Sequence, residues 1–320
     1  MKGWLNGMVY GVGKCLVWGI AILPLRWVAF LGRLMGRLAF VVDRRHRRVA
    51  VGQLAWYLKR HQREGHAIDW AREHFRRLGE SYLCAIKTAH MSHQAISSHI
   101  RYSGFEVFDQ ETDGGSPPEW NRGWVVAIGH FGNFELYVRT MSQIQGYQGG
   151  ATYRGLNQPG PDRLLRELRE RSGVQFFDRR KDVESFRSFM RKGSTVMGLL
   201  ADQTTGSGLD LAFLGKNCKC STAPAIMAQR YQCRLVSAIC YREGPSQWHI
   251  EYGEEIPLFD QGERRPVESI TREINDVFEQ AIHRDPLNWF WVHDRWKAFK
   301  KKKRRPDKRR SRSGSGNERP

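Results

Sequence analysis

A histidine and a glutamate, His130 and Glu135, lie in the stretch GHFGNFE (129–135), directly after the apolar run WVVAIG (124–129). An imidazole titrates at a pH of about 6.5, so it can accept and return a proton near neutrality. A carboxylate that reaches its other ring nitrogen orients the ring and stabilises its protonated form. Open α/β sheets place such groups where a strand ends and the chain turns into a helix. The spacing therefore predicts a general base with a carboxylate partner at the end of a strand.

No protein nucleophile accompanies this pair, because the sequence contains no G-x-S-x-G elbow and no clear cysteine nucleophile. The pair therefore suits a reaction in which a hydroxyl of the substrate attacks and His130 takes its proton. Gly129 and Gly132 would let that substrate approach the backbone. We expect a helix to begin near Asn133, where its unpaired N–H groups would favour negative charge. On this pattern alone, a loop histidine that only forms hydrogen bonds is an equal alternative.

The elements that must position these residues follow from the hydrophobic pattern. Residues 43–98 show helical spacing of their large apolar side chains. From residue 124 onward, short runs rich in β-formers alternate with amphipathic helical stretches. This alternation predicts an α/β fold with a mainly parallel central sheet flanked by helices. The expected strands are WVVAIG, GATYRG, VQFFD, STVMGLLAD, RLVSAICY and WHIEYG.

The N-terminal part is apolar but interrupted by basic residues. The uncharged run 15–25 has 11 residues, whereas a simple spanning helix needs about 20. We expect a break at Pro24 and then an in-plane helix over 25–48 in an anionic membrane interface. A tilted span and a buried helix are the alternatives. The stripe of arginines that favours the in-plane helix comprises Arg26, Arg33 and Arg37, extended by Arg44 and Arg48.

The net charge of +19 is unevenly distributed. The segment from Lys297 to the C-terminus holds 12 Lys/Arg and two acidic residues, so the rest of the chain keeps a charge of +9. Such a surplus indicates an anionic partner, namely lipid headgroups, nucleic acid or an acidic carrier protein, or else only a basic surface. We predict a membrane-anchoring segment 1–42, a catalytic domain 43–297 and a basic disordered tail 298–320.

Cysteine spacing predicts neither a metal site nor a disulfide framework. The six cysteines form no C-x-x-C pair, and the CKC segment (218–220) lacks the spacing of a zinc site. We therefore expect free thiols in a reducing compartment, with no metal and no cofactor. Near the C-terminus, Trp289, Trp291 and Trp296 are expected to pack or to anchor at an interface. His293 is expected to be structural.

The order of the short motifs carries a family resemblance. GHFGNFE resembles the H-x-x-x-x-D/E motif of the lysophospholipid acyltransferase superfamily. The complete order of segments resembles the late lipid A acyltransferases of the lauroyl and myristoyl type. It covers roughly residues 45–297. The further matching segments are Tyr153-Arg154-Gly155 (with glycine where the family has proline), Asp202-Gln203, STAPA and WFWVHDRWK.

This resemblance implies a glycerolipid acyltransferase-like fold and acyl transfer from an acyl-carrier-protein thioester to a hydroxyl of a lipid A precursor. His130 would be the general base and Glu135 its orienting partner. Arg154 would contact phosphate or the developing oxyanion. The enzyme would act on the cytoplasmic face of a bacterial inner membrane, with an anionic lipid as acceptor. The other residues that it implies for substrate binding are Asp202, Gln203, Asn133 and Gly132.

Other functions remain open on the sequence. Relatives with the same core motif acylate other glycolipids or phospholipids, of the phosphatidylinositol mannoside or lysophospholipid type. A nucleic-acid-binding protein is motivated by the basic tail, but no RRM-, KH- or zinc-finger-like signature accompanies it. A membrane-binding protein without catalytic activity is the third alternative, against which the intact His130 and Glu135 pair argues.

Overall fold

The computed structural model describes residues 2–109 and 123–297. Both the helical region 43–98 and the later strand–helix alternation are confirmed. Within the described residues the helices are α1 (Lys2–Ile22), α2 (Leu25–Val42), α3 (Arg44–Arg60), α4 (Ala67–Thr88), α5 (His93–Ser97), α6 (Leu136–Met141), α7 (Pro159–Glu170), α8 (Val183–Arg191), α9 (Ala223–Tyr231) and α10 (Val267–Arg284), with the 3-10 turns η1 (Phe105–Phe108) and η3 (Pro286–Asn288).

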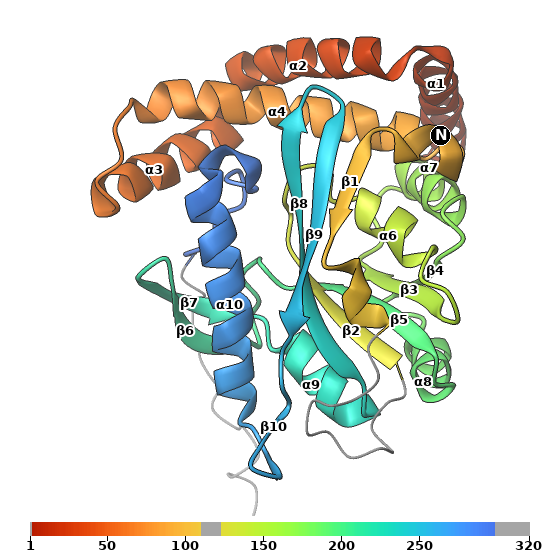
Figure 1. Ribbon diagram of the computed structural model, residues 1–320. Coiled ribbons are helices and arrows are strands. Elements are labelled where there is room, and N and C mark those ends of the chain that lie inside the picture. The colour runs from red at the N-terminus through yellow and green to blue at the C-terminus, as the bar shows by residue number, and fades with distance from the viewer. Residues whose placement is uncertain (1, 110–122, 298–320) are drawn as a thin grey trace, which may run out of the picture.

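One seven-stranded sheet forms the centre of the molecule, in the order β1-β9-β8-β2-β5-β3-β4 (Figure 1). The five strands from β8 to β4 are parallel, whereas β9 runs antiparallel to β8 and β1 runs parallel to β9. The predicted mainly parallel sheet is thus confirmed. The strands are β1 (Ile100–Ser103), β2 (Gly123–Ile128), β3 (Gln148–Tyr153), β4 (Gln175–Asp178), β5 (Thr195–Leu200), β8 (Arg234–Gly244) and β9 (Gln247–Glu255), besides the hairpins β6 (Leu209–Phe213)–β7 (Lys216–Cys220) and β10 (Phe259–Asp260)–β11 (Glu263–Arg264).

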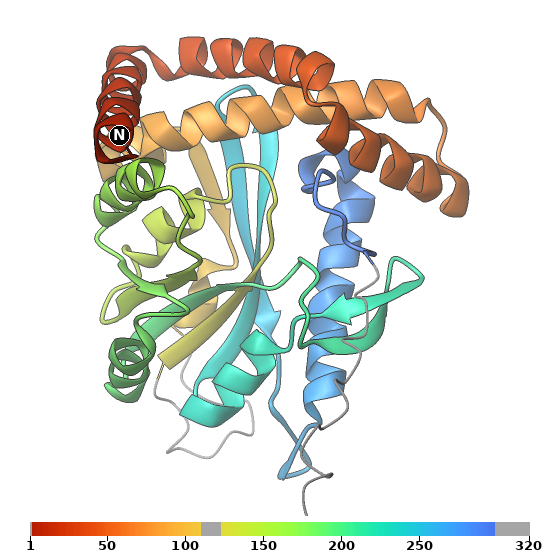
Figure 2. The same cartoon turned by 180° about the vertical axis from the view of Figure 1, so that it is seen from behind.

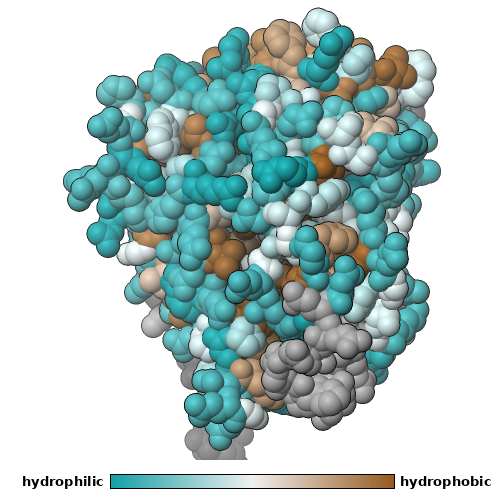
Figure 3. Space-filling view, viewed as in Figure 1, coloured by the Kyte–Doolittle hydropathy of each residue, from teal (hydrophilic) through white to brown (hydrophobic). Residues whose placement is uncertain are grey.

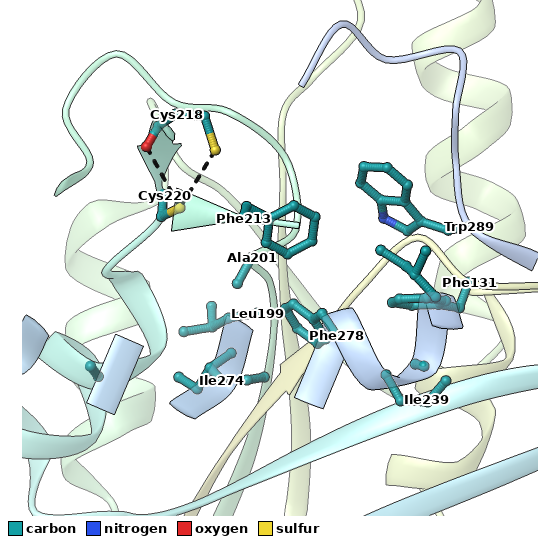
Figure 4. Close-up of a cluster of buried hydrophobic side chains, with 14 of the residues drawn as sticks. Phe131, Leu199, Ala201, Phe213, Cys218, Cys220, Ile239, Ile274, Phe278 and Trp289 are labelled. Atoms are coloured by element: carbon teal, nitrogen blue, oxygen red, sulfur yellow. Dashed lines mark hydrogen bonds between the residues drawn. The ribbon is translucent and has the colours of Figure 1, made fainter. Parts of the chain in front are cut away.

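Two apolar cores cover the two faces of this sheet. On one face, α9, α10 and the β6–β7 hairpin bury a cluster that includes Phe131, Phe213, Phe278 and Trp289 (Figure 4). On the other face, α6 and η1 pack over a second cluster around Trp124. All six residues of β2 are buried, which is typical of a central parallel strand covered by helices on both sides. The strand that leads to His130 is therefore held on both faces.

Helices α2 and α4 lie side by side across one end of the sheet (Figures 1 and 2). Glycines permit this close approach: a Cβ atom on Gly36 of α2 would lie 2.1 Å from the carbonyl oxygen of Phe75. Arg33 of α2 forms ion pairs with Glu73 (3.0 Å) and Glu80 (3.3 Å) of α4. One side of α2 therefore packs against α4.

The expected single helix over 25–48 is wrong in two respects. The chain does break at Pro24, but α2 ends at Val42, and the Asp43 side chain accepts a hydrogen bond from the backbone of His46 to begin α3. Arg44 and Arg48 therefore belong to another helix. Arg33 turns toward α4 instead of toward lipid, while Arg26 and Arg37 are exposed. The arginines of α2 are spaced for one helical stripe, but the central one, Arg33, forms ion pairs with Glu73 and Glu80 of α4.

Among the helices of the described ranges, none combines the length and the apolar character that crossing a bilayer requires. The basic tail 298–320 lies outside the described residues. The division at 42/43 coincides with the junction of α2 and α3. The roles assigned to the segments 1–42, 43–297 and 298–320 stay predictions.

Candidate active site

Neighbouring strands bring His130 and Asp202 together. Strands β2 and β5 pair in parallel, with Ile128 opposite Leu200. His130 follows Ile128 by two positions, and Asp202 follows Leu200 by two positions. The backbone N–H of Ala201 donates to the carbonyl of Ile128 at 2.9 Å, which extends the pairing toward the site. Because the two strands end at the same level, the side chains that follow them face each other at the carboxyl edge of the sheet.

The contact between them is short and buried. Nδ1 of His130 lies 2.7 Å from Oδ1 of Asp202, and the backbone N–H of His130 donates to Oδ2 at 3.0 Å. The indole Nε1 of Trp289 donates to the same Oδ2 at 2.8 Å. With an ionised carboxylate on Nδ1, that nitrogen carries the proton of the neutral imidazole and Nε2 keeps a free lone pair. Nε2 of His130 is thus the ring nitrogen that can accept a proton.

The pKa of Asp202 lies below its ordinary value despite complete burial. Burial acts to raise this pKa, but the electrostatic attraction of His130 and the hydrogen bonds from His130 and Trp289 outweigh it. The carboxylate therefore stays ionised at neutral pH and can stabilise a protonated imidazole.

The partner predicted for His130 is corrected by this geometry. Glu135 pairs with Arg169 instead, with its carboxylate oxygens 2.6 Å from Nη2 and 3.2 Å from Nε. The chain turns between 130 and 135, and α6 begins only at Leu136, so the five-residue spacing does not place Glu135 on Nδ1. Glu135 and Arg169 nevertheless line the same cavity as His130.

That cavity has a volume of about 480 Å³ and is mostly apolar. Its walls come from α1, α4, α6 and α7, and His130, Gln203 and Phe290 contribute to its lining. The amide Nε2 of Gln203 lies 3.4 Å from Nε2 of His130, and the ring of His130 is flanked by Phe134 (4.9 Å) and Phe290 (5.5 Å). The apolar side chains of the lining include Val17, Ile86, Val138, Leu164, Leu165, Leu168 and Leu200.

A base at the wall of an apolar cavity suits a reaction on a molecule with a long hydrocarbon chain. The family model described as bacterial lipid A biosynthesis acyltransferase matches residues 6–298, which is nearly the whole chain. The chain belongs to this family. Comparison with curated proteins finds no match.

Two predicted substrate-binding residues of this family member, Gly132 and Asn133, lie in the turn that follows β2. The backbone N–H of Gly132 donates to the carbonyl of Asn288 at 2.9 Å, and its φ of +50° favours glycine. A Cβ atom at Gly132 would lie 2.6 Å from the carbonyl oxygen of Cys240, so this glycine approaches β8. The Asn133 side chain is buried, outside the lining of the cavity. The helix expected to begin near Asn133 begins three residues later, at Leu136, and has only six residues. The predicted preference for negative charge at its start stays a prediction.

Arg154 follows β3 at the same edge of the sheet, but its side chain is exposed and does not line the cavity. The guanidinium groups that line the cavity come from Arg139 of α6 and Arg169 of α7. Gly155, where the family has proline, lies beside Asp178, because a Cβ atom there would be 2.8 Å from Oδ2. Sequence reasoning missed Arg169, since an arginine in an amphipathic helix has no signal that separates it from a surface residue.

The C-terminal tryptophan segment contacts both residues of the pair, since Trp289 bonds to Asp202 and Phe290 lies beside His130. Trp289 and Trp291 are buried, as the packing interpretation predicted, but Trp289 also donates to Asp202. Nε2 of His293 accepts from the backbone of Thr204 at 3.3 Å, next to Gln203, and burial lowers the pKa of His293. The order of the motifs indicated that this segment belongs with the site, but no local sequence pattern predicts the hydrogen bond from Trp289 to Asp202.

Proposed function

We propose that this member of the lipid A biosynthesis acyltransferase family moves a fatty acyl chain from an acyl-carrier-protein thioester to a hydroxyl of a lipid A precursor. The observation that carries the proposal is the His130–Asp202 pair at the wall of an apolar cavity of about 480 Å³. The cavity holds the donor chain, and the thioester carbonyl lies next to His130. The proposed reaction needs no cofactor.

The reaction follows from the orientation of His130. As the acceptor oxygen attacks the thioester carbonyl carbon, its proton moves to Nε2 of His130, while Nδ1–H stays bound to Asp202. The tetrahedral intermediate then collapses with cleavage of the C–S bond. The imidazolium returns the proton to the leaving sulfur, which yields the ester and a free thiol. The amide of Gln203, 3.4 Å from Nε2, is positioned to donate to the carbonyl oxygen as it gains charge.

The ion pair between Glu135 and Arg169, together with Arg139, supplies the charged side chains of the cavity lining. The two paired side chains are largely buried, with exposures of 23% and 18%. Glu135 holds the Arg169 guanidinium in place, and the guanidinium can bind a polar group of the thioester or of the acceptor. Glu135 thus acts through Arg169, as a positioning residue.

An exposed basic edge supports an acyl carrier protein as donor. Arg154 follows β3, and Arg179, Arg180 and Lys181 follow the adjacent strand β4; all four side chains are exposed. The N–H of Arg179 donates to the carbonyl of Tyr153 at 3.1 Å, which holds the two loops together. The first loop leads into α7, a wall of the cavity. An acidic carrier protein bound here would present its thioester near the cavity.

We expect the purified protein to acylate a lipid A precursor from an acyl-carrier-protein thioester, as detected by mass spectrometry. Reversing two charges, Arg179→Glu with Arg180→Glu, should raise KM for this donor roughly tenfold, because the loss of charge contacts weakens encounter and binding. KM for an uncharged acyl-pantetheine thioester should not change.

The control is the same charge reversal at the exposed end of α3, Lys59→Glu with Arg60→Glu. Equal KM values for the two variants would show that the basic edge does not bind the carrier protein. If no thioester donor supports transfer by the wild-type protein, the proposed function is wrong.

The outer face of α2 supports membrane attachment. Apolar side chains gather where α2 lies (Figure 3), and Trp27, Phe30, Leu34 and Leu38 are each more than half exposed. Exposed arginines such as Arg37 lie beside this face and suit anionic headgroups. We propose that α1 and α2 lie in the cytoplasmic leaflet of the inner membrane with the catalytic domain beneath it. The free cysteines of the described residues agree with a reducing compartment.

Replacing two leucines of this face, Leu34→Asp with Leu38→Asp, should lower partitioning into anionic vesicles by about 10²-fold, since each leucine contributes about 1.5 kcal/mol of apolar burial. Vesicle flotation measures this. The matched control changes two exposed residues elsewhere, Leu209→Asp with Ile226→Asp. If the two variants float alike, the α2 face is not the membrane surface.

A further inference from the structure

Arg139 brings a buried positive charge to the apolar cavity proposed for the donor chain. It belongs to α6, lines the cavity, and is only 5% exposed. Glu135 lies one helical turn before it, a spacing that often gives an ion pair, but the carboxylate of Glu135 pairs with Arg169. No carboxylate of residues 2–109 or 123–297 forms an ion pair with Arg139.

Two backbone carbonyls fix the Arg139 guanidinium. Nη2 donates to the carbonyl of Met91 at 2.6 Å, and Nη1 donates to the carbonyl of Arg171 at 3.3 Å. The third nitrogen, Nε, is buried and makes no hydrogen bond with any described residue. Burial lowers the pKa of Arg139, but a guanidinium remains charged at neutral pH. A buried donor of a charged group thus has no acceptor, which costs free energy.

Arg139 lies at the end of the cavity that is remote from the catalytic histidine. The cavity follows α4 from Tyr82, whose ring contacts Phe134 beside that histidine, to Ala89. Seven residues of α-helix span about 10 Å. Met91, which accepts the hydrogen bond from Nη2, follows Ala89 by two positions. At this end α4, α6 and α7 lie together, on the side of the molecule where the N-terminus lies (Figure 1).

Two hydroxyl groups line the same end, but neither serves Nε of Arg139. Oγ1 of Thr88 donates to the carbonyl of Ala85 at 3.2 Å, and Oγ of Ser172 donates to the carbonyl of Arg169 at 2.7 Å. A chain of hydrocarbon alone would leave Nε without an acceptor. An oxygen atom on that chain would accept a charge-assisted hydrogen bond from it.

We propose that Arg139 binds an oxygen atom that the donor acyl chain carries at a distance from its thioester, so that the cavity selects oxygen-bearing chains over unsubstituted ones. The ligand class is a fatty acyl chain with a hydroxyl or carboxylate group. The inference rests on the proposed function, because it assigns the donor chain to this cavity. Arg139 then determines specificity and takes no part in the proton transfer.

Binding of donor analogues tests this inference without acyl transfer. The probes are pantetheine thioethers, which cannot donate an acyl group, with chains of equal carbon number that are unsubstituted, hydroxylated or ended by a carboxylate. We expect the wild-type protein in detergent to bind a chain with its oxygen about 10 Å from the sulfur roughly tenfold more tightly than the unsubstituted chain. A hydroxyl next to the sulfur should give no preference. Isothermal titration calorimetry measures the Kd values.

Replacing the arginine tests its role directly. Arg139→Met keeps an unbranched apolar side chain and removes the donors, so it should bind substituted and unsubstituted chains with equal Kd values. The control Arg230→Met, at an exposed position of α9, should keep the wild-type preference. Circular dichroism shows whether each variant is folded. The comparison of chains in the wild-type protein does not depend on the variant, so it decides the matter even if Arg139→Met unfolds.

The outcomes separate the inference from the proposed function. A preference for the hydroxyl or for the carboxylate supports the inference and identifies the oxygen that is bound. Equal affinity of the wild-type protein for all chains overturns it, since water would then satisfy Nε. A folded Arg139→Met that keeps the preference also overturns it. A preference that depends on Arg139 in a protein that transfers no acyl group would contradict the proposed function and leave the Arg139 site standing.

Discussion

Asp202→Asn is expected to lower kcat by roughly 10³-fold, close to the loss expected for His130→Ala. An amide on Nδ1 no longer holds the imidazole in the tautomer that leaves Nε2 free, and it cannot stabilise the imidazolium. Glu135→Gln should cost much less, because Glu135 acts through Arg169 and makes no hydrogen bond to His130 in the structure. Steady-state rates with an acyl-carrier-protein donor measure these differences.

The matched control is Asp260→Asn, the same change at an exposed position of β10. Thermal unfolding should show that each variant remains folded. The opposite order of effects, with Glu135→Gln inactive and Asp202→Asn close to the wild type, would restore Glu135 as the partner of His130. A high rate for His130→Ala would rule out general-base catalysis by this histidine.

Glu80→Leu is expected to lower the free energy of unfolding by about 3 kcal/mol or more, since it leaves partly buried guanidinium groups without their counter-charge. Only 1% of the Glu80 side chain is exposed. Its carboxylate accepts hydrogen bonds from Arg33 of α2 (3.3 Å), Arg242 of β8 (3.0 Å) and the backbone N–H of Ser246 (3.1 Å). One carboxylate thus joins α2, α4 and the sheet.

Denaturant unfolding in detergent, followed by circular dichroism, measures this loss. The control Glu184→Leu, at a position of α8 where 81% of the side chain is exposed, should change the free energy of unfolding by less than about 0.5 kcal/mol. If both variants unfold at the same denaturant concentration, the contacts of Glu80 do not hold α2 against the sheet.

The sequence by itself determined most of the secondary structure and the edge of the sheet where the site lies. The apolar run before His130 and the run before Asp202 are strands β2 and β5. The segment PDRLLRELRERSG (161–173), one of the amphipathic stretches between the expected strands, lies largely in α7, which begins at Pro159. These features depend on short-range patterns, namely the alternation of apolar residues and the conformations that proline and glycine favour.

Only the tertiary structure decided which residues meet at that edge. Asp202 is 72 residues from His130 and reaches its Nδ1 because β2 and β5 are neighbours with ends at the same level. Glu135 is close to His130 in the chain, but its carboxylate pairs with Arg169 of α7, which is 34 residues from Glu135. Spacing along the chain constrains only near neighbours, whereas strand order and register depend on how the whole sheet buries its two faces. For the same reason, the sequence predicted the arginine stripe of α2, but it did not predict the ion pair between Arg33 and Glu80.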